Sequence, residues 1–155
     1  MSDAPDTEPP AEPPVLDAQG NVVEEFRVVT AESVTYDLSD SSPFVHLMET
    51  QPPYRNLSIP IAIGEATALQ LALDGGTGRR PGTHELASEL LARLRADVVA
   101  VRIVREEGGV YYAELDLMGP GGHVVVDSRP SDAIILAMRQ RPPAPILCAR
   151  GVLDA

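Results

Sequence analysis

Residues 124–143 constrain the fold of this chain more than any other segment. An apolar, strand-like run is followed by the polar residues 127–129, by Pro130 and by a mostly apolar stretch that ends in Pro142 and Pro143. Proline suits the first position of a helix because its missing N–H would have no partner there and its fixed φ is already helical. The segment therefore predicts a strand that passes directly into a largely buried helix.

Short strand-like and helical patterns alternate along the rest of the chain from Phe26. Strands are expected over residues 25–38, 43–50, 55–64, 98–107, 110–119, 123–127 and 144–149. The first three suggest a meander, and residues 98–119 read as a hairpin that turns at Gly108 and Gly109. Together with three helical segments, these patterns predict one α+β domain over residues 26–155.

Two helices are expected before the hairpin. The first follows Gly64, ends at Gly75 and Gly76, and places Ala66 and Leu69 on one apolar stripe. The second is expected over residues 84–97, with Thr83 as its N-cap. It carries the clearest amphipathic pattern in the chain, a leucine at every fourth position: Leu86, Leu90 and Leu94.

Charge is distributed unevenly along the chain. The 155 residues carry a net charge of −11, with 23 acidic and 12 basic residues, and every basic residue is arginine. Residues 1–25 contain seven of the acids, no base and several prolines, so we expect a disordered acidic tail. The remainder has a net charge of −4, which argues against tight, salt-sensitive binding to nucleic-acid backbones.

The single cysteine and the hydropathy pattern narrow the class of protein. One cysteine excludes an internal disulfide framework and a cysteine-rich metal site, and Cys148 lies in an apolar run where a buried thiol is expected. No run approaches the roughly 18 apolar residues that a membrane span requires. The N-terminus lacks the order of charges of a secretory signal, so a cytoplasmic protein is expected.

Polar residues at the junctions between strands and helices are the candidates for chemistry. The sequence contains no phosphate-binding loop, nucleophile elbow or zinc motif of the familiar kinds. Helix N-termini nevertheless present free amides to anions. The strand-to-helix segments 59–73 and 123–138 share a similar pattern, so their junctions would lie side by side if the two halves pack as a pseudo-repeat.

Cleavage of a phosphodiester bond would need these residues to act together. His84 or Glu65 would serve as the base, Arg129 would stabilise the developing charge, and Asp127 with Asp132 would bind a divalent ion such as Mg²⁺. Simpler alternatives stay open. Acids in first turns stabilise helices in any protein. The alternative for His84 is an exposed side chain without a role, and the alternative for Arg129 is a local salt bridge with Asp127 or Asp132.

The chain resembles the bifunctional nuclease domain family over about residues 26–155. The similarity lies in "IPIAIGEATALQLAL" at 59–73, "RPGTHELASELLARL" at 80–94, "VYYAELDL" at 110–117 and "VVVDSRPSDAIILAMRQRPPAPI" at 124–146. The family motif positions correspond to Glu65, Thr83, His84, Glu85, Asp127, Arg129, Ser131 and Asp132. Glu85 stands where the family tends to have aspartate.

The resemblance implies a fold and an activity. It implies a single compact α+β domain with a mixed β-sheet and about three helices, often found as a dimer in bacteria and plants and credited with RNase and DNase activity. Glu65, His84, Arg129 and Asp132 would then be catalytic, and Asp127 and Asp132 would ligate a metal. The residues expected to bind the substrate are Thr83, Glu85, Ser131 and, in the basic loop 78–82, Arg80.

Two functions therefore follow from the sequence. The first is a nuclease that acts on RNA and DNA, with metal assistance, weak binding of nucleic acid and little sequence selectivity. The second is a non-catalytic regulatory module, in which the helix N-termini bind a small anion or a carboxylate of a partner. One experiment distinguishes them. Only the nuclease should lose turnover when Arg129 or Asp132 is replaced by alanine in variants that remain folded.

Overall fold

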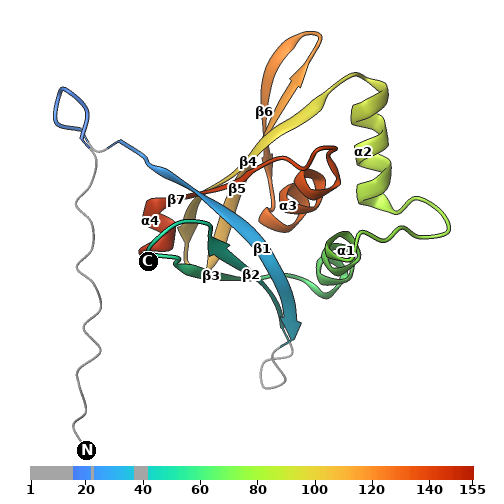
Figure 1. Ribbon diagram of the computed structural model, residues 1–155, viewed down its shortest axis with the longest axis horizontal. Coiled ribbons are helices and arrows are strands. Elements are labelled where there is room, and N and C mark those ends of the chain that lie inside the picture. The colour runs from blue at the N-terminus through green and yellow to red at the C-terminus, as the bar shows by residue number, and fades with distance from the viewer. Residues whose placement is uncertain (1–15, 22, 37–41) are drawn as a thin grey trace, which may run out of the picture.

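A computed structural model describes residues 16–21, 23–36 and 42–155 as a sheet with helices packed against it (Figure 1). Its elements in chain order are β1 (Phe26–Tyr36), β2 (Pro43–Glu49), β3 (Asn56–Pro60), α1 (Ile63–Leu73), α2 (Thr83–Arg93), β4 (Asp97–Glu107), β5 (Val110–Gly119), β6 (Gly122–Ser128), α3 (Pro130–Arg139), β7 (Ile146–Ala149) and α4 (Arg150–Leu153). This is the α+β domain expected, with four helices rather than about three.

The seven strands form one mixed sheet in the order β3-β2-β1-β7-β4-β5-β6. β7 pairs in parallel with β4 and antiparallel with β1, and all other neighbours are antiparallel. The meander β1–β2–β3 and the β4–β5 hairpin confirm two predictions from the pattern. Gly108 and Gly109 make the hairpin turn at φ 59° and 83°, in the left-handed region that glycine adopts without steric cost.

α3 lies at the centre of the fold, as its apolar sequence predicts. Pro130 occupies the first turn after Arg129, the N-cap, and Ile134, Ile135 and Ala137 are fully buried. The helix packs against β4, β5, α1 and α2. Ala66 and Leu69 of α1 are also fully buried, and so is Cys148 of β7, where burial raises the thiol pKa to about 12. The core thus lies between the sheet and α1 and α3.

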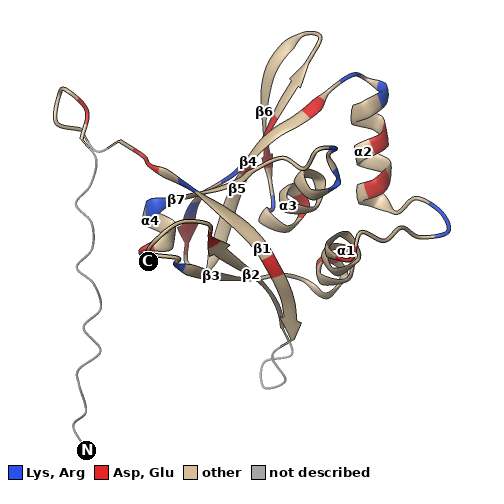
Figure 2. Ribbon diagram, in the orientation of Figure 1, with Lys and Arg blue, Asp and Glu red and all other residues tan. Residues whose placement is uncertain are grey.

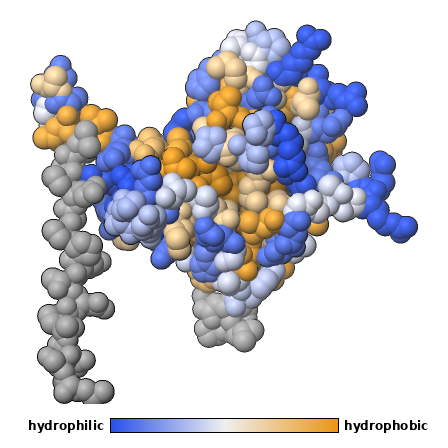
Figure 3. All heavy atoms as spheres, viewed as in Figure 1, coloured by the Kyte–Doolittle hydropathy of each residue, from blue (hydrophilic) through white to orange (hydrophobic). Residues whose placement is uncertain are grey.

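α2 differs from its prediction in two respects. Thr83 is not the N-cap but the first helical residue, because Gly82 holds the extended conformation before the helix. The helix also ends at Arg93, earlier than expected, and it has no fully buried residue. Its leucines at positions 86, 90 and 94 are 52%, 54% and 71% exposed. The amphipathic stripe therefore lies at the margin of the core and is largely open to solvent. Figure 3 shows that the face of the molecule seen there exposes hydrophobic residues among hydrophilic ones.

The N-terminal segment is only partly described. Residues 1–15 and 22 of the expected acidic tail lie outside the described residues. Asp17 accepts hydrogen bonds from the backbone N–H groups of Gln19 and Asn21, which hold a local turn. Glu25 contacts the last helix, because its carbonyl accepts a bond from Arg150 N at 2.8 Å. None of the helices in the described residues is long and apolar enough to cross a membrane.

Candidate functional site

Three helices begin close to one another in the fold. α1 follows β3 after a two-residue link, α3 follows β6 after Arg129 alone, and α2 packs against α3 (Figure 1). Glu65, His84 and Asp132 all lie in the first turns of these helices, and Arg129 is the N-cap of α3. The four residues predicted to be catalytic are therefore brought together, and the two strand-to-helix junctions do lie side by side.

Asp132 is the centre of this cluster. Its Oδ1 lies 2.7 Å from His84 Nε2, and its Oδ2 accepts a 2.7 Å hydrogen bond from Arg129 Nε. Partial burial raises the pKa of Asp132, but the hydrogen bonds from Arg129 and His84 outweigh burial and hold that pKa below its ordinary value. The same hydrogen bond to Asp132 raises the pKa of Arg129. Asp132 is therefore a carboxylate at neutral pH.

Glu65 joins the starts of α1 and α3. Its Oε2 accepts a 2.6 Å hydrogen bond from the backbone N–H of Ala62, which satisfies a free amide at the start of α1. Its Oε1 accepts a hydrogen bond from Ser131 Oγ and lies 3.6 Å from Arg129 Nε. The Glu65 side chain is 12% exposed, and Ser131 is 1% exposed. Ser131 thus positions Glu65 from a buried place at the wall of a surface hollow.

Arg129 separates two adjoining hollows in the surface. The first, of about 460 Å³, is lined by Thr83, His84 and Asp132, and the second, of about 330 Å³, by Tyr111 and apolar residues. Arg129 and Glu65 line both. The Arg129 side chain is 64% exposed although two of its nitrogens contact Asp132. The guanidinium therefore faces solvent at the junction of the two hollows.

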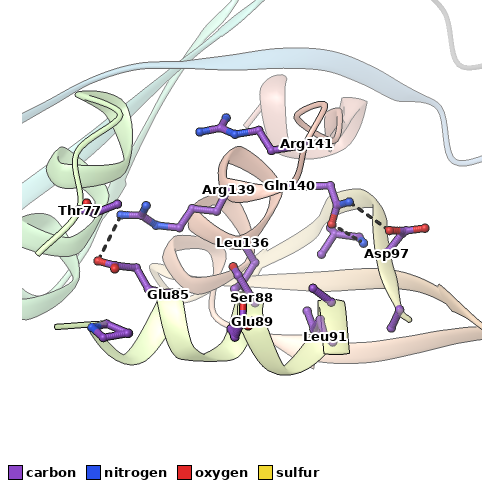
Figure 4. A pocket seen from close by; sticks show the side chains of 14 residues that line it. Thr77, Glu85, Ser88, Glu89, Leu91, Asp97, Leu136, Arg139, Gln140 and Arg141 are labelled. Atoms are coloured by element: carbon purple, nitrogen blue, oxygen red, sulfur yellow. Dashed lines mark hydrogen bonds and ion pairs between the residues drawn. The ribbon is translucent and has the colours of Figure 1, made fainter. Parts of the chain in front are cut away.

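Glu85 and Arg80 lie apart from this cluster. Glu85 lines a larger hollow, of about 640 Å³, between α2 and α3 (Figure 4), where its Oε1 lies 3.4 Å from Gly78 N and 3.9 Å from Arg139 Nη2. Arg80 is exposed in the loop between α1 and α2, which carries basic residues away from the helix starts (Figure 2). Thr83 is thus the one residue of these three that lines the hollow beside His84.

The proposed metal ligands do not form a preformed set. Asp127 is paired across the β5–β6 register with Glu114, on the face of β5 opposite the buried Ala113 and Leu115. Mg²⁺ prefers free carboxylate oxygens, but both oxygens of Asp132 accept hydrogen bonds from His84 or Arg129. Among the described residues no group of three or more His, Cys, Asp and Glu side chains is arranged to hold a metal. The ligation of a metal by Asp127 and Asp132 stays a prediction that this arrangement does not favour.

Residues 45–155 match the model of the bifunctional nuclease domain, and this segment contains every residue of the cluster. The chain belongs to the bifunctional nuclease domain family. Two curated relatives are 37% identical to it over 83 residues: uncharacterized protein MT1877 of Mycobacterium tuberculosis strain CDC 1551 / Oshkosh and uncharacterized protein Rv1829 of strain H37Rv. The alignment covers 52% of this chain and 49% of each relative, so it spans about half the length of these proteins.

The sequence of this bifunctional nuclease domain did not reveal two features of the site. One is the contact of Ser131 with Glu65, since both residues are polar and lie 66 positions apart. The other is Tyr111 beside Arg129. Tyr111 alternates with the buried Ala113 and Leu115, which places it on the inner face of β5. Nothing local, however, indicated that the β4–β5 turn would lie next to the start of α3.

Proposed function

We propose that this chain is a nuclease that hydrolyses phosphodiester bonds in RNA and DNA at the cleft around Arg129. The observation that carries the proposal is a solvent-facing arginine beside a histidine that a carboxylate holds in place, both at the edge of one hollow. Phosphodiester hydrolysis needs a base to activate water and a cation to stabilise the charge on phosphorus-bound oxygens. His84 and Arg129 supply these two groups.

The contact with Asp132 determines how His84 can act. An ionised carboxylate can only accept hydrogen bonds, so His84 Nε2 must carry the hydrogen in the 2.7 Å contact with Asp132 Oδ1. Nδ1 of a neutral imidazole is then the basic nitrogen. It would take a proton from a water molecule whose oxygen attacks phosphorus. The leaving oxygen, on the opposite side of phosphorus, would take its proton from solvent, and the imidazolium would lose its proton to solvent afterwards.

Arg129 is arranged to bind the phosphate. Its Nε and Nη2 donate to Asp132, while Nη1 forms no hydrogen bond with other described residues. An exposed guanidinium N–H can therefore donate to a non-bridging phosphate oxygen. Because two carboxylates, Glu65 and Asp132, lie beside the single guanidinium of Arg129, the site attracts phosphate only weakly when His84 is neutral. Binding of nucleic acid would accordingly be weak, in keeping with the net charge of −11.

A non-catalytic anion-binding module is the second candidate. The observation in its favour is that the carboxylates of Glu65 and Asp132 are both engaged in contacts that join the starts of three helices. In that case Arg129 would bind a phosphate or a partner carboxylate without turnover. Such a module would bind ligand equally well whether or not position 84 can accept a proton.

Turnover by matched variants tests the proposal. The purified full chain is assayed on labelled single-stranded RNA and DNA, in parallel reactions with Mg²⁺ and with chelator. Arg129→Ala is expected to lower kcat at least 100-fold, as loss of a transition-state cation does. Arg93→Ala is the control, because Arg93 is also exposed and also paired, with Glu89 at 2.7 Å. Cleavage that is undiminished in Arg129→Ala would identify a contaminant and refute the nuclease.

A further inference from the structure

The second hollow beside Arg129 has a different chemistry from the first. Its walls include Ile59 and Ile61 from the link between β3 and α1, Val110 and Tyr111 from the start of β5, and Pro130. We call it the Tyr111 hollow. Among the described residues, the charged side chains that line it are Arg129 and Glu65, which it shares with the hollow of His84. These mostly apolar walls suit an uncharged ligand group that has an apolar face.

Continuity with Arg129 indicates which group that is. A phosphate in a nucleic-acid strand carries a nucleoside on each side, and Arg129 lines two hollows whose other walls are mostly different residues. A nucleobase is flat and uncharged, and bases stack on tyrosine rings in proteins that bind single strands. The volume of about 330 Å³ is ample for one base. The Tyr111 hollow thus offers what one of the two flanking nucleosides requires.

We propose that the Tyr111 hollow binds one nucleobase, that of a nucleotide adjoining the phosphate held by Arg129. This inference rests on the proposed nuclease function and narrows its substrate to single-stranded nucleic acid, because a base that is paired within a duplex cannot turn into the hollow. Besides Tyr111, the polar side chains among the described residues that line it are Arg129, Glu65 and Ser131, and Glu65 already contacts both of the others. Stacking on Tyr111 is therefore expected to hold the base more than its hydrogen-bonding edge does, so that no one base is strongly preferred.

The neighbouring tyrosine provides a matched control. Tyr112 alternates to the opposite face of β5, where Arg105 lies 4.1 Å from the centre of its ring. It is the same residue type, one position along the same strand, and does not line the hollow. A general effect of losing a tyrosine from β5 would appear in both Tyr111→Ala and Tyr112→Ala, whereas an effect on base binding would appear only in Tyr111→Ala.

Fluorescence anisotropy of labelled tetranucleotides measures the binding, with an abasic residue at each position in turn. Tyr111→Ala is expected to raise the Kd of the intact strand about tenfold, as loss of one stacked base does, and Tyr111→Phe and Tyr112→Ala to change it less than twofold. A strand with an abasic residue at one of the four positions should bind the wild type with a Kd raised by a similar factor. For that strand, Tyr111→Ala should not raise the Kd further. Tyr111→Leu keeps apolar packing against the core, and should still lose binding.

Distinct results overturn the inference and the proposed function. Equal binding by Tyr111→Leu and wild type, equal binding of intact and abasic strands, or equal binding of a duplex would each refute the base site. No binding of any strand by the wild type would refute both. Base-dependent binding without turnover would refute the nuclease alone, and turnover without base dependence would refute the Tyr111 site alone.

Discussion

Replacement of Asp132 by asparagine tests how His84 acts. The substitution keeps the shape of the side chain and removes its charge. An asparagine amide can donate to His84 Nε2, which would place the imidazole hydrogen on Nδ1, the nitrogen that faces away from position 132. His84 would then no longer present a basic nitrogen to a water molecule. The variant is therefore expected to bind nucleic acid and to cleave it slowly.

The size of the effect follows from the contacts that change. A positioned general base contributes about 10²- to 10⁴-fold to a rate, so kcat should fall at least about 100-fold. The cost in stability is smaller, because Arg129 is 64% exposed and exposed ion pairs contribute about 0.2–1 kcal/mol. A loss of about 1 kcal/mol leaves a domain of ordinary stability almost entirely folded. Reduced turnover would then report on the site and not on unfolding.

Single-turnover cleavage and binding are measured on the same preparations. The expected result is a large fall in the rate constant, a Kd within about threefold of the wild type and an unchanged circular dichroism spectrum. Asp97→Asn is a suitable control, because Asp97 also accepts a side-chain hydrogen bond, from Gln140, but does not line the hollow of His84. A rate constant within threefold of the wild type in Asp132→Asn would refute the role assigned to the His84–Asp132 contact.

Three further predictions concern the stability of the fold. Glu49 is 2% exposed and binds Arg27 and Arg55, so Glu49→Gln should lower the free energy of unfolding by about 3 kcal/mol in urea titrations; a change under 1 kcal/mol would contradict this. Burial raises the Glu49 pKa, but the hydrogen bonds from Arg55 and Arg27 outweigh burial and lower that pKa. The ionised Glu49 therefore stabilises the fold above about pH 4.5, and this stabilisation is lost as pH falls through the lowered pKa. Acid titrations of the wild type should show this loss of stability, and Glu49→Gln should show less of it. Leu69→Ala, at a fully buried site, should lower the free energy of unfolding by about 2–5 kcal/mol, whereas Leu90→Ala, at a side chain 54% exposed, should lower it by less than about 1 kcal/mol. A large loss of stability in Leu90→Ala, with a change of mass in sedimentation, would show that a second copy of the chain covers α2.

Local signals predicted much of this fold because their causes are local. Pro130 fixes the start of α3 through its own geometry, and Gly108 and Gly109 permit the turn between β4 and β5. The position of β7 between β1 and β4 has no such signal, because it depends on pairing between distant segments. The solvent exposure of Leu86 and Leu90 could not be predicted either, since a helical stripe indicates a preferred face but not whether a partner covers all of it.

The sequence predicted which residues form the site better than it predicted the contacts between them. Glu65, His84 and Asp132 stand at helix starts, which the sequence indicates through the ends of strands and the apolar periodicity that follows. Their convergence depends on α1 and α2 packing against α3, which no local pattern specifies. The sequence did not indicate whether Arg129 would form its ion pair with Asp127 or with Asp132. In the structure the partner is Asp132, because it lies one helical turn after Arg129, whereas Asp127 lies on the outer face of β6.

The structural and catalytic explanations of the ion-pair cluster are compatible in this domain. α2 contributes no fully buried residue, so contacts such as that of His84, whose side chain is 19% exposed, matter for its attachment. The 2.7 Å contact with Asp132 therefore both joins α2 to α3 and fixes which nitrogen of His84 carries the hydrogen. It follows that Asp132→Asn should accelerate hydrogen exchange of α2 amides as well as slow cleavage. His84→Gln separates the two roles, because a glutamine amide can still donate to Asp132 but cannot serve as a base. In this variant the hydrogen exchange of the α2 amides should stay as slow as in the wild type, while turnover should be abolished.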